Sequence, residues 1–156
     1  MADEHVVQLT QQGYNELVAE LEELKQTKLP AAINRVALAR SQGDLRENSE
    51  YHAAREELAM LEGRRDELEN VLQRAEIIQK SANGIVELGS GVEVEVNGGS
   101  TKHTFYIVGE WEADPREKKI SEKSPLGTAL KGKKAGEEVS IDAPAGTITY
   151  KIHNVV

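Results

Sequence analysis

The chain has 156 residues, of which 38% are hydrophobic and 29% are charged, and its formal net charge is -8. These proportions predict a folded protein with one ordinary domain or two small ones and exclude an intrinsically disordered chain. A free-standing duplex DNA-binding protein is usually basic, so the net charge argues against that class. Because the chain has no cysteine, disulfides and thiolate metal sites are excluded, and we expect a cytoplasmic protein without a secretory signal or membrane attachment.

The first long element is a predicted helix that begins after Thr10. Thr10 can act as its N-cap, with Leu9 and Tyr14 placed as a hydrophobic staple. Pro30 is expected to kink or briefly interrupt the helix, because proline lacks an N–H and clashes with the preceding turn. Gly43 is typical of a helix end. The helix carries one apolar stripe at spacings of three and four residues, made of Tyr14, Leu17, Leu21 and Leu24.

A second helix is predicted from Tyr51 to Ala75. Its apolar residues repeat at alternating spacings of three and four, interrupted only by Arg65, which is coiled-coil periodicity. Because the connection over 41–48 is short, the two helices should fold back antiparallel. At about 1.5 Å per residue, roughly thirty residues per arm give a rod on the order of 45 Å long with the connection at its tip.

The second half has strand periodicity instead of helical periodicity. Ser124 can cap one helix, with Pro125 at its first position and an end near Gly132. Turns are expected at 97–99 and 144–146. Strands are predicted over 85–88, 91–96, 102–108, 139–142 and 147–155.

The predicted fold class is therefore α+β. Residues 1–80 form a long antiparallel coiled-coil hairpin with an acidic tip near 43–51. Residues 81–156, which begin with a linker over 81–84, form a small antiparallel β domain with one helix.

Two acids at the predicted tip, Asp44 and Glu47, allow two interpretations. In a capping box, Asp44 would cap the second helix and Glu47 would bond back to it. Alternatively, both carboxylates form part of a magnesium site, because Mg²⁺ prefers octahedral oxygen coordination and commonly takes only one or two carboxylates from a protein. A partner would then complete the coordination. The spacing alone leaves both interpretations open.

Positive charge gathers around these acids although the protein is acidic overall. Arg40, Arg46 and Arg55 flank the tip and could contact RNA phosphates. The alternative is that these arginines form ion pairs on the flanks of the coiled coil. The acids near enough in sequence for such pairs are Glu50, Glu56 and Glu57.

The tip also carries a family resemblance. Residues 43–51, Gly-Asp-Leu-Arg-Glu-Asn-Ser-Glu-Tyr, resemble the tip motif of the GreA/GreB transcript elongation factors, and the details are closer to the GreA branch. The similarity covers nearly the whole chain. Further matching segments are 9–10, 13–14, 51–56, 108–109, 112–115, 120–121, 124–126 and 144–146.

The resemblance implies an FKBP-like shape for the second domain and a role without stand-alone nuclease activity. The coiled coil would enter the secondary channel of bacterial RNA polymerase, and the globular domain would dock at the channel rim. Backtracked RNA extrudes its 3′ end into this channel. The polymerase would then hydrolyse an internal phosphodiester with two Mg²⁺ ions, rescuing the arrested complex.

The resemblance also implies roles for individual residues. Asp44 would help to hold the second Mg²⁺ jointly with the polymerase, without binding it stably alone, and Glu47 would orient or deprotonate the attacking water. Arg40 and Arg55 match the basic patch that steers the RNA 3′ end. The part that faces the channel rim in relatives contains Ser124, Pro125 and Leu126.

Other functions are weighed against this one. A non-cleaving regulator or inhibitor that binds the same channel is the nearest alternative, and the presence of both tip acids argues against it. A prolyl isomerase or chaperone is suggested by the second domain's shape, but aromatic residues are only 4% of the chain, too few to line a proline pocket. A generic coiled-coil scaffold explains the helical repeat but not the acidic tip.

Overall fold

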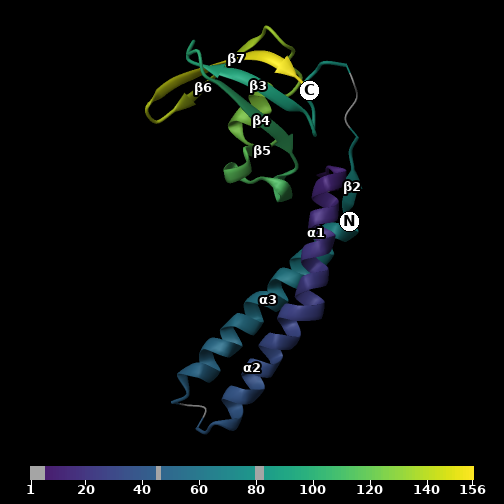
Figure 1. Cartoon of the computed structure of the whole chain (residues 1–156), viewed down its shortest axis with the longest axis vertical. Helices are drawn as coiled ribbons and strands as arrows, with labels where there is room; N and C mark the ends of the chain where they lie inside the picture. Colours follow the sequence, from purple (N-terminus) through teal and green to yellow (C-terminus); the bar gives the residue numbers. More distant parts are fainter. Residues whose placement is uncertain (1–5, 45–46, 80–82) are drawn as a thin grey trace, which may run out of the picture. The chain divides into compact units, whose positions relative to one another are not determined.

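The computed structural model describes residues 6–44, 47–79 and 83–156 (Figure 1). Within these ranges the chain forms two compact units. The first contains residues 15–75 and is helical, and the second contains residues 6–14 together with 76–156 and is built around a sheet. The predicted fold class is confirmed. The predicted domain boundary at 80–81 and the first half of the 81–84 linker lie outside the described residues.

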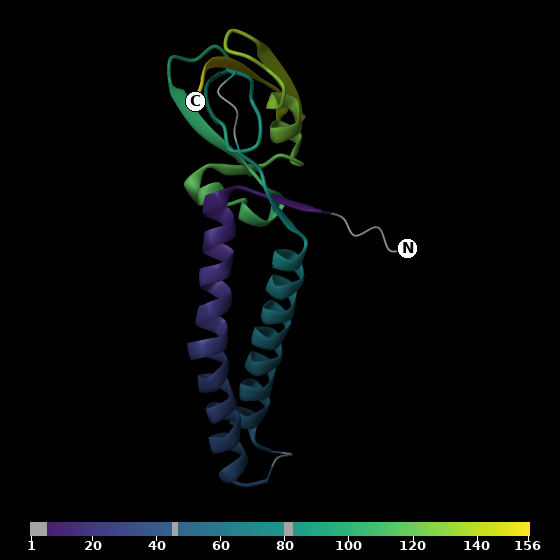
Figure 2. The same cartoon turned by 90° about the vertical axis from the view of Figure 1, so that its right-hand side faces the viewer.

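The first unit is a two-armed helical hairpin. One arm consists of α1 (Gln11–Glu23), from residue 15 onward, a π-helix (Leu24–Lys28) and α2 (Leu29–Ser41), and α3 (Ser49–Gln73) is the other arm. Figures 1 and 2 show α2 and α3 side by side and running in opposite directions. The predicted antiparallel hairpin is therefore confirmed, and no described helix is long and apolar enough to cross a membrane.

Pro30 is accommodated by the π-helix that precedes it. The Leu29 N–H donates to the Leu24 carbonyl, five residues back instead of four. This wider turn relieves the crowding that a proline ring causes against the preceding carbonyls. Pro30 then lies in the first turn of α2, where a missing N–H costs little. The expected interruption is present, and it takes the form of one wide turn.

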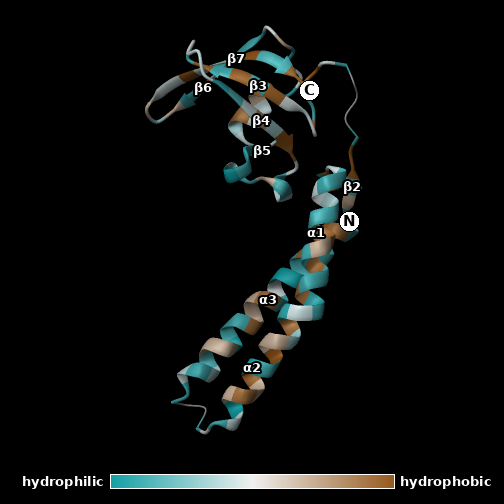
Figure 3. Ribbon diagram, viewed as in Figure 1, coloured by the Kyte–Doolittle hydropathy of each residue, from teal (hydrophilic) through white to brown (hydrophobic). Residues whose placement is uncertain are grey.

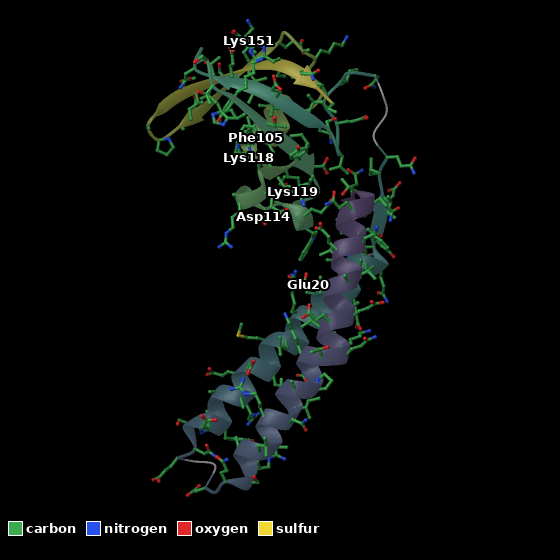
Figure 4. All side chains as sticks on the ribbon, viewed as in Figure 1. Glu20, Phe105, Asp114, Lys118, Lys119 and Lys151 are labelled. Atoms are coloured by element: carbon green, nitrogen blue, oxygen red, sulfur yellow. The ribbon has the colours of Figure 1, made fainter. Side chains whose placement is uncertain are left out.

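The two arms are held together by an aliphatic core and by surface ion pairs. The apolar residues, brown in Figure 3, recur along both arms. Each fully buried large aliphatic or aromatic side chain contributes about 1.5–3 kcal/mol. The buried set is Leu17, Leu24, Leu29, Ala32, Ala39, Tyr51, Ala54, Leu68 and Val71. Glu20, labelled in Figure 4, accepts hydrogen bonds of 2.7 and 3.0 Å from Arg64 of the opposite arm. Such half-exposed pairs contribute little individually.

The second unit is a five-stranded sheet covered by one short helix. Its strand order is β5-β4-β3-β7-β6, and α4 (Pro125–Leu130) begins at the predicted N-cap, Ser124. The strands are β3 (Gly91–Val96), β4 (Lys102–Val108), β5 (Lys119–Ser121), β6 (Glu138–Ala143) and β7 (Gly146–Val155). The core between sheet and helix contains Val86, Val92, Val94, Ile107, Leu130, Val139 and Ile152.

The sheet differs from the prediction in two places. β5 is an additional strand that pairs parallel with β4, so the sheet is mixed and not wholly antiparallel. Residues 85–88 are not a strand, and only one bridge joins Ile85 to Lys134. Both differences concern stretches of three or four residues, in which the alternation of side chains is too short to identify a strand.

The N-terminal segment belongs to the second unit. β1 (Val7–Leu9) pairs with β2 (Ala75–Ile77), and the Ile78 N–H donates to the Leu9 carbonyl at 2.8 Å. The Leu9 side chain has no exposed surface. Thr10 caps α1 as predicted, because its hydroxyl oxygen accepts the Gly13 N–H at 3.0 Å.

Candidate functional site

The candidate site is the connection between α2 and α3. α2 ends at Ser41, Gly43 turns the chain with a φ of +137°, and α3 begins at Ser49. Asp44 and Glu47 both lie in this connection, and both side chains are exposed. The connection is at the end of the hairpin, as Figures 1 and 2 show. Leu45 and Arg46 lie outside the described residues.

Asn48, and not Asp44, caps the second arm. The Asn48 Oδ1 atom accepts the Tyr51 N–H at 3.0 Å, and its Nδ2 atom donates to the Ala39 carbonyl at 2.6 Å. The capping-box interpretation is therefore wrong, because Asp44 lies five residues before α3 begins. An amide serves better than a carboxylate here, since it can accept the Tyr51 N–H and donate to Ala39 at the same time.

The two exposed acids suit part of a magnesium site. Carboxylate oxygens are the ligands that Mg²⁺ prefers, and two of them match the usual protein share of its coordination. Within residues 6–44, 47–79 and 83–156 there is no cluster of three or more possible metal-ligating side chains. Asp44 and Glu47 offer two oxygen-donor side chains, fewer than the six ligands of an octahedral Mg²⁺ ion.

Arg40 and Arg55, from the two helices that the connection joins, contact the same aromatic ring. Their Cζ atoms are 5.8 and 5.7 Å from the centre of the Tyr51 ring. Neither arginine has an ion-pair partner among the described residues, and Glu57 pairs with Arg35 instead. The arginines thus contact an aromatic ring in place of the predicted ion pairs with acids. A hydrogen bond from Arg40 lowers the pKa of Tyr51, and the nearby positive charges add to this effect.

The three residues predicted to face the channel rim differ in exposure. Ser124 caps α4, because its Oγ atom accepts the Gly127 N–H at 3.0 Å and donates to the Ser121 carbonyl at 2.6 Å. Leu126 packs against the core of the second unit, and Pro125 is exposed. Pro125 is therefore the member of this group that offers most surface to another molecule.

A carboxylate-centred cluster in the second unit was not predicted from the sequence. Glu112 accepts the Thr10 N–H at 3.0 Å and the Gly109 N–H at 3.1 Å, and the Thr10 hydroxyl donates to the same carboxylate. A Cβ atom on Gly13 would lie 1.7 Å from the Glu112 Oε1 atom. Gly13 and Gly109 were the only hint of this cluster in the sequence. Residue spacing cannot reveal a contact between positions that are 102 residues apart.

Two aromatic side chains that could have lined a proline pocket are used for packing. The Phe105 and Tyr150 rings meet edge to face with their centres 6.4 Å apart, and both residues pack against the core of the second unit. This arrangement gives no support to a prolyl isomerase.

Comparison with known proteins places both halves of the chain in one family. Residues 7–77 match the model "Transcription elongation factor, N-terminal", and residues 81–156 match "Transcription elongation factor, GreA/GreB, C-term". A transcription elongation factor GreA of Listeria welshimeri is 45% identical over 158 residues, covering 99% of this chain and 98% of the relative. One from Lactococcus lactis subsp. cremoris SK11 is 44% identical over 149 residues, covering 94% and 96%.

Two solved structures are also similar. One is the GreA factor homolog 1 of Thermus thermophilus, which is 31% identical, with 97% of this chain and 99% of that chain covered and a TM-score of 0.46. The other is its counterpart from Thermus aquaticus, which is 33% identical, with 96% and 97% covered and a TM-score of 0.45.

Proposed function

This chain belongs to the GreA/GreB family of transcription elongation factors, and from that premise we propose that it stimulates RNA polymerase to cleave backtracked RNA. The helical hairpin would enter the secondary channel of the polymerase, and the second unit would dock at the channel rim. The observation that carries the proposal is the exposure of Asp44 and Glu47 in the connection at the end of the hairpin.

The two acids would divide the chemistry between them. Asp44 would supply one oxygen ligand to a Mg²⁺ ion that the polymerase also holds, and Glu47 would orient the attacking water and accept its proton. The metal would polarise the phosphodiester and lower the pKa of the water. Neither acid is occupied as the cap of α3, because Asn48 performs that role.

The protein would have no hydrolytic activity of its own. Two carboxylates supply too few ligands to hold Mg²⁺ firmly without a partner. RNA polymerase and the 3′ end of backtracked RNA are therefore the proposed partners. Arg40 and Arg55 would contact the RNA phosphates, and Pro125 would lie toward the channel rim.

Replacing either acid tests the proposal directly. We expect Asp44→Asn and Glu47→Gln to reduce stimulated cleavage in a purified backtracked complex by about 100-fold or more, because each substitution removes a ligand or a base at the reacting atoms. Affinity for the polymerase should remain unchanged. Both quantities can be measured with end-labelled RNA and fluorescently labelled protein.

Glu62→Gln is the matched control, because Glu62 is an exposed acid on α3 away from the connection. This variant should stimulate cleavage as the unaltered protein does. Normal stimulation by both tip variants would contradict the proposal. An unaltered protein that binds the polymerase without stimulating cleavage would instead be a non-cleaving secondary-channel regulator.

A further inference from the structure

Tyr51 occupies the junction between the two helices beside the acidic connection. Its side chain is 6% exposed, although it is only three residues from Asn48 in the connection. Arg40 comes from the last turn of α2, and Arg55 lies one turn beyond Tyr51 on α3. One buried ring is therefore the shared contact of two arginines from different helices.

The Tyr51 ring and hydroxyl together hold the arginines while using little of their hydrogen-bonding capacity. A guanidinium near an aromatic ring is attracted to its π-electrons, and most of its N–H groups remain able to bind oxygen. In an arginine paired with glutamate, several of these N–H groups would already be bonded to the carboxylate. Arg35 is in that situation, because it pairs with Glu57. Within the described residues Arg40 and Arg55 have no such acid partner, so their fork-shaped donors suit phosphate oxygens.

The same residue is tied to the connection that carries the acids. The backbone N–H of Tyr51 donates to Asn48, and Asn48 also donates to Ala39 at the end of α2. The backbone of Tyr51 thus helps to close the connection, while its ring contacts the two arginines. A change in the ring alone should disturb the arginines and leave the backbone bond in place.

We propose that Tyr51 is a positioning residue that holds Arg40 and Arg55 together as one clamp for neighbouring phosphates of a single RNA strand. This inference rests on the proposed function, because the strand is the RNA extruded from a backtracked polymerase. The clamp would add affinity for backtracked complexes, whereas the acids act on the reaction itself.

The test measures binding in magnesium-free buffer, where cleavage cannot occur. Labelled protein is titrated into a backtracked complex and into one whose RNA 3′ end remains in the active site. The unaltered protein should bind the backtracked complex more tightly. Tyr51→Leu should lose about fivefold of that preference, and Tyr51→Phe should lose only part of it, because phenylalanine retains the ring but not the hydroxyl oxygen that the arginines bond. In Tyr51→Leu the slope of log affinity against log salt should also fall by about 0.7 for each phosphate that the arginines no longer neutralise.

Two controls separate positioning from general stability. Adding Tyr51→Leu to Arg40→Gln/Arg55→Gln should cause no further loss of preference, because the ring acts only through the arginines. Leu68→Ala, a buried position elsewhere on α3, should lower the melting temperature but leave the preference unchanged. A further loss in the triple variant, or an equal loss in Leu68→Ala, would overturn the inference.

The outcomes also distinguish this inference from the proposed function. If the unaltered protein shows no preference for the backtracked complex, the clamp does not exist. If the preference is present and depends on Tyr51 but magnesium restores no cleavage, the proposed function fails and the clamp stands.

Discussion

At the scale of single residues, Glu112 shows how one carboxylate can fix two distant pieces of chain. It accepts hydrogen bonds from the backbone of Thr10 and Gly109, and both positions belong to the second unit. Ionised acceptors make hydrogen bonds roughly twice as strong as neutral ones. Gly109 must be small, since a Cβ atom there would lie 2.3 Å from the Gln8 carbonyl oxygen.

Glu112→Gln keeps the shape of the side chain and removes its charge. We expect the free energy of unfolding of the second unit to fall by about 1–3 kcal/mol, because three charge-assisted bonds become neutral or are broken. Fluorescence of Trp111, the one tryptophan in the sequence, can follow denaturant unfolding of this unit. Glu110→Gln is the matched control, because Glu110 is exposed and its contact to Lys123 is long at 3.4 Å. Equal losses in both variants would contradict the role of Glu112.

At the scale of helices and strands, Asn48 joins the end of one arm to the start of the other. We expect Asn48→Ala to lower the free energy of unfolding of the hairpin by about 1–2 kcal/mol, because it removes an N-cap. Asn48→Asp should give an intermediate loss, since aspartate can accept the Tyr51 N–H but cannot donate to Ala39. Far-UV circular dichroism in denaturant measures both. If Asn48→Asp is as stable as the unaltered protein, the bond to Ala39 contributes nothing.

The long elements and the capped helix α4 could be predicted from the sequence, but the pairing of the three-residue strands could not. The repeats of α1 and α3 and the alternation in β3, β4 and β7 continue for enough residues to identify the element. β1, β2 and β5 have three residues each, so only their pairing partners define them. The sequence also could not identify which residue caps α3, because Asp44 and Asn48 are both good N-caps. The bond from Asn48 to Ala39, nine residues away, belongs to the folded hairpin.

The placement of the two acids in an exposed connection could be predicted from the sequence. The exposure of Asp44 and Glu47 follows from a short connection between two long helices. The contact of Arg40 and Arg55 with Tyr51 could not be predicted. Tyr51 fits the spacing of the apolar repeat, and that pattern predicts burial in the hairpin but no contact with arginine. Which acid each arginine could reach depends on the packing of the two arms, and spacing along one helix does not determine it.

At the scale of the whole molecule, the N-terminal segment, residues 6–14, belongs to the same unit as residues 76–156, which are far from it in the sequence. Leu9 is fully buried and belongs with residues 76–156. We expect Leu9→Ala to lower the free energy of unfolding of the second unit by about 2–5 kcal/mol, because it leaves a cavity. The Trp111 fluorescence transition should shift, although the tryptophan is far from position 9 in the sequence.

Leu68→Ala provides the comparison for Leu9→Ala, because Leu68 is buried in the helical hairpin. Its effect should fall mainly on the far-UV circular dichroism transition, to which helices contribute most. Equal shifts of both signals in both variants would show instead that the two units unfold as one cooperative body.

The π-helix also accommodates one extra residue in the first arm of the hairpin. In a regular helix, one surplus residue rotates every later side chain by about 100° around the axis. Leu24 and Leu29 are five positions apart and both buried, so the wide turn absorbs the surplus and keeps the two halves of the arm in phase. A one-residue deletion within 25–28, combined with Pro30→Ala, would yield a continuous α-helix with the same buried face. A deletion anywhere else in the arm would turn the acidic connection out of register with α3.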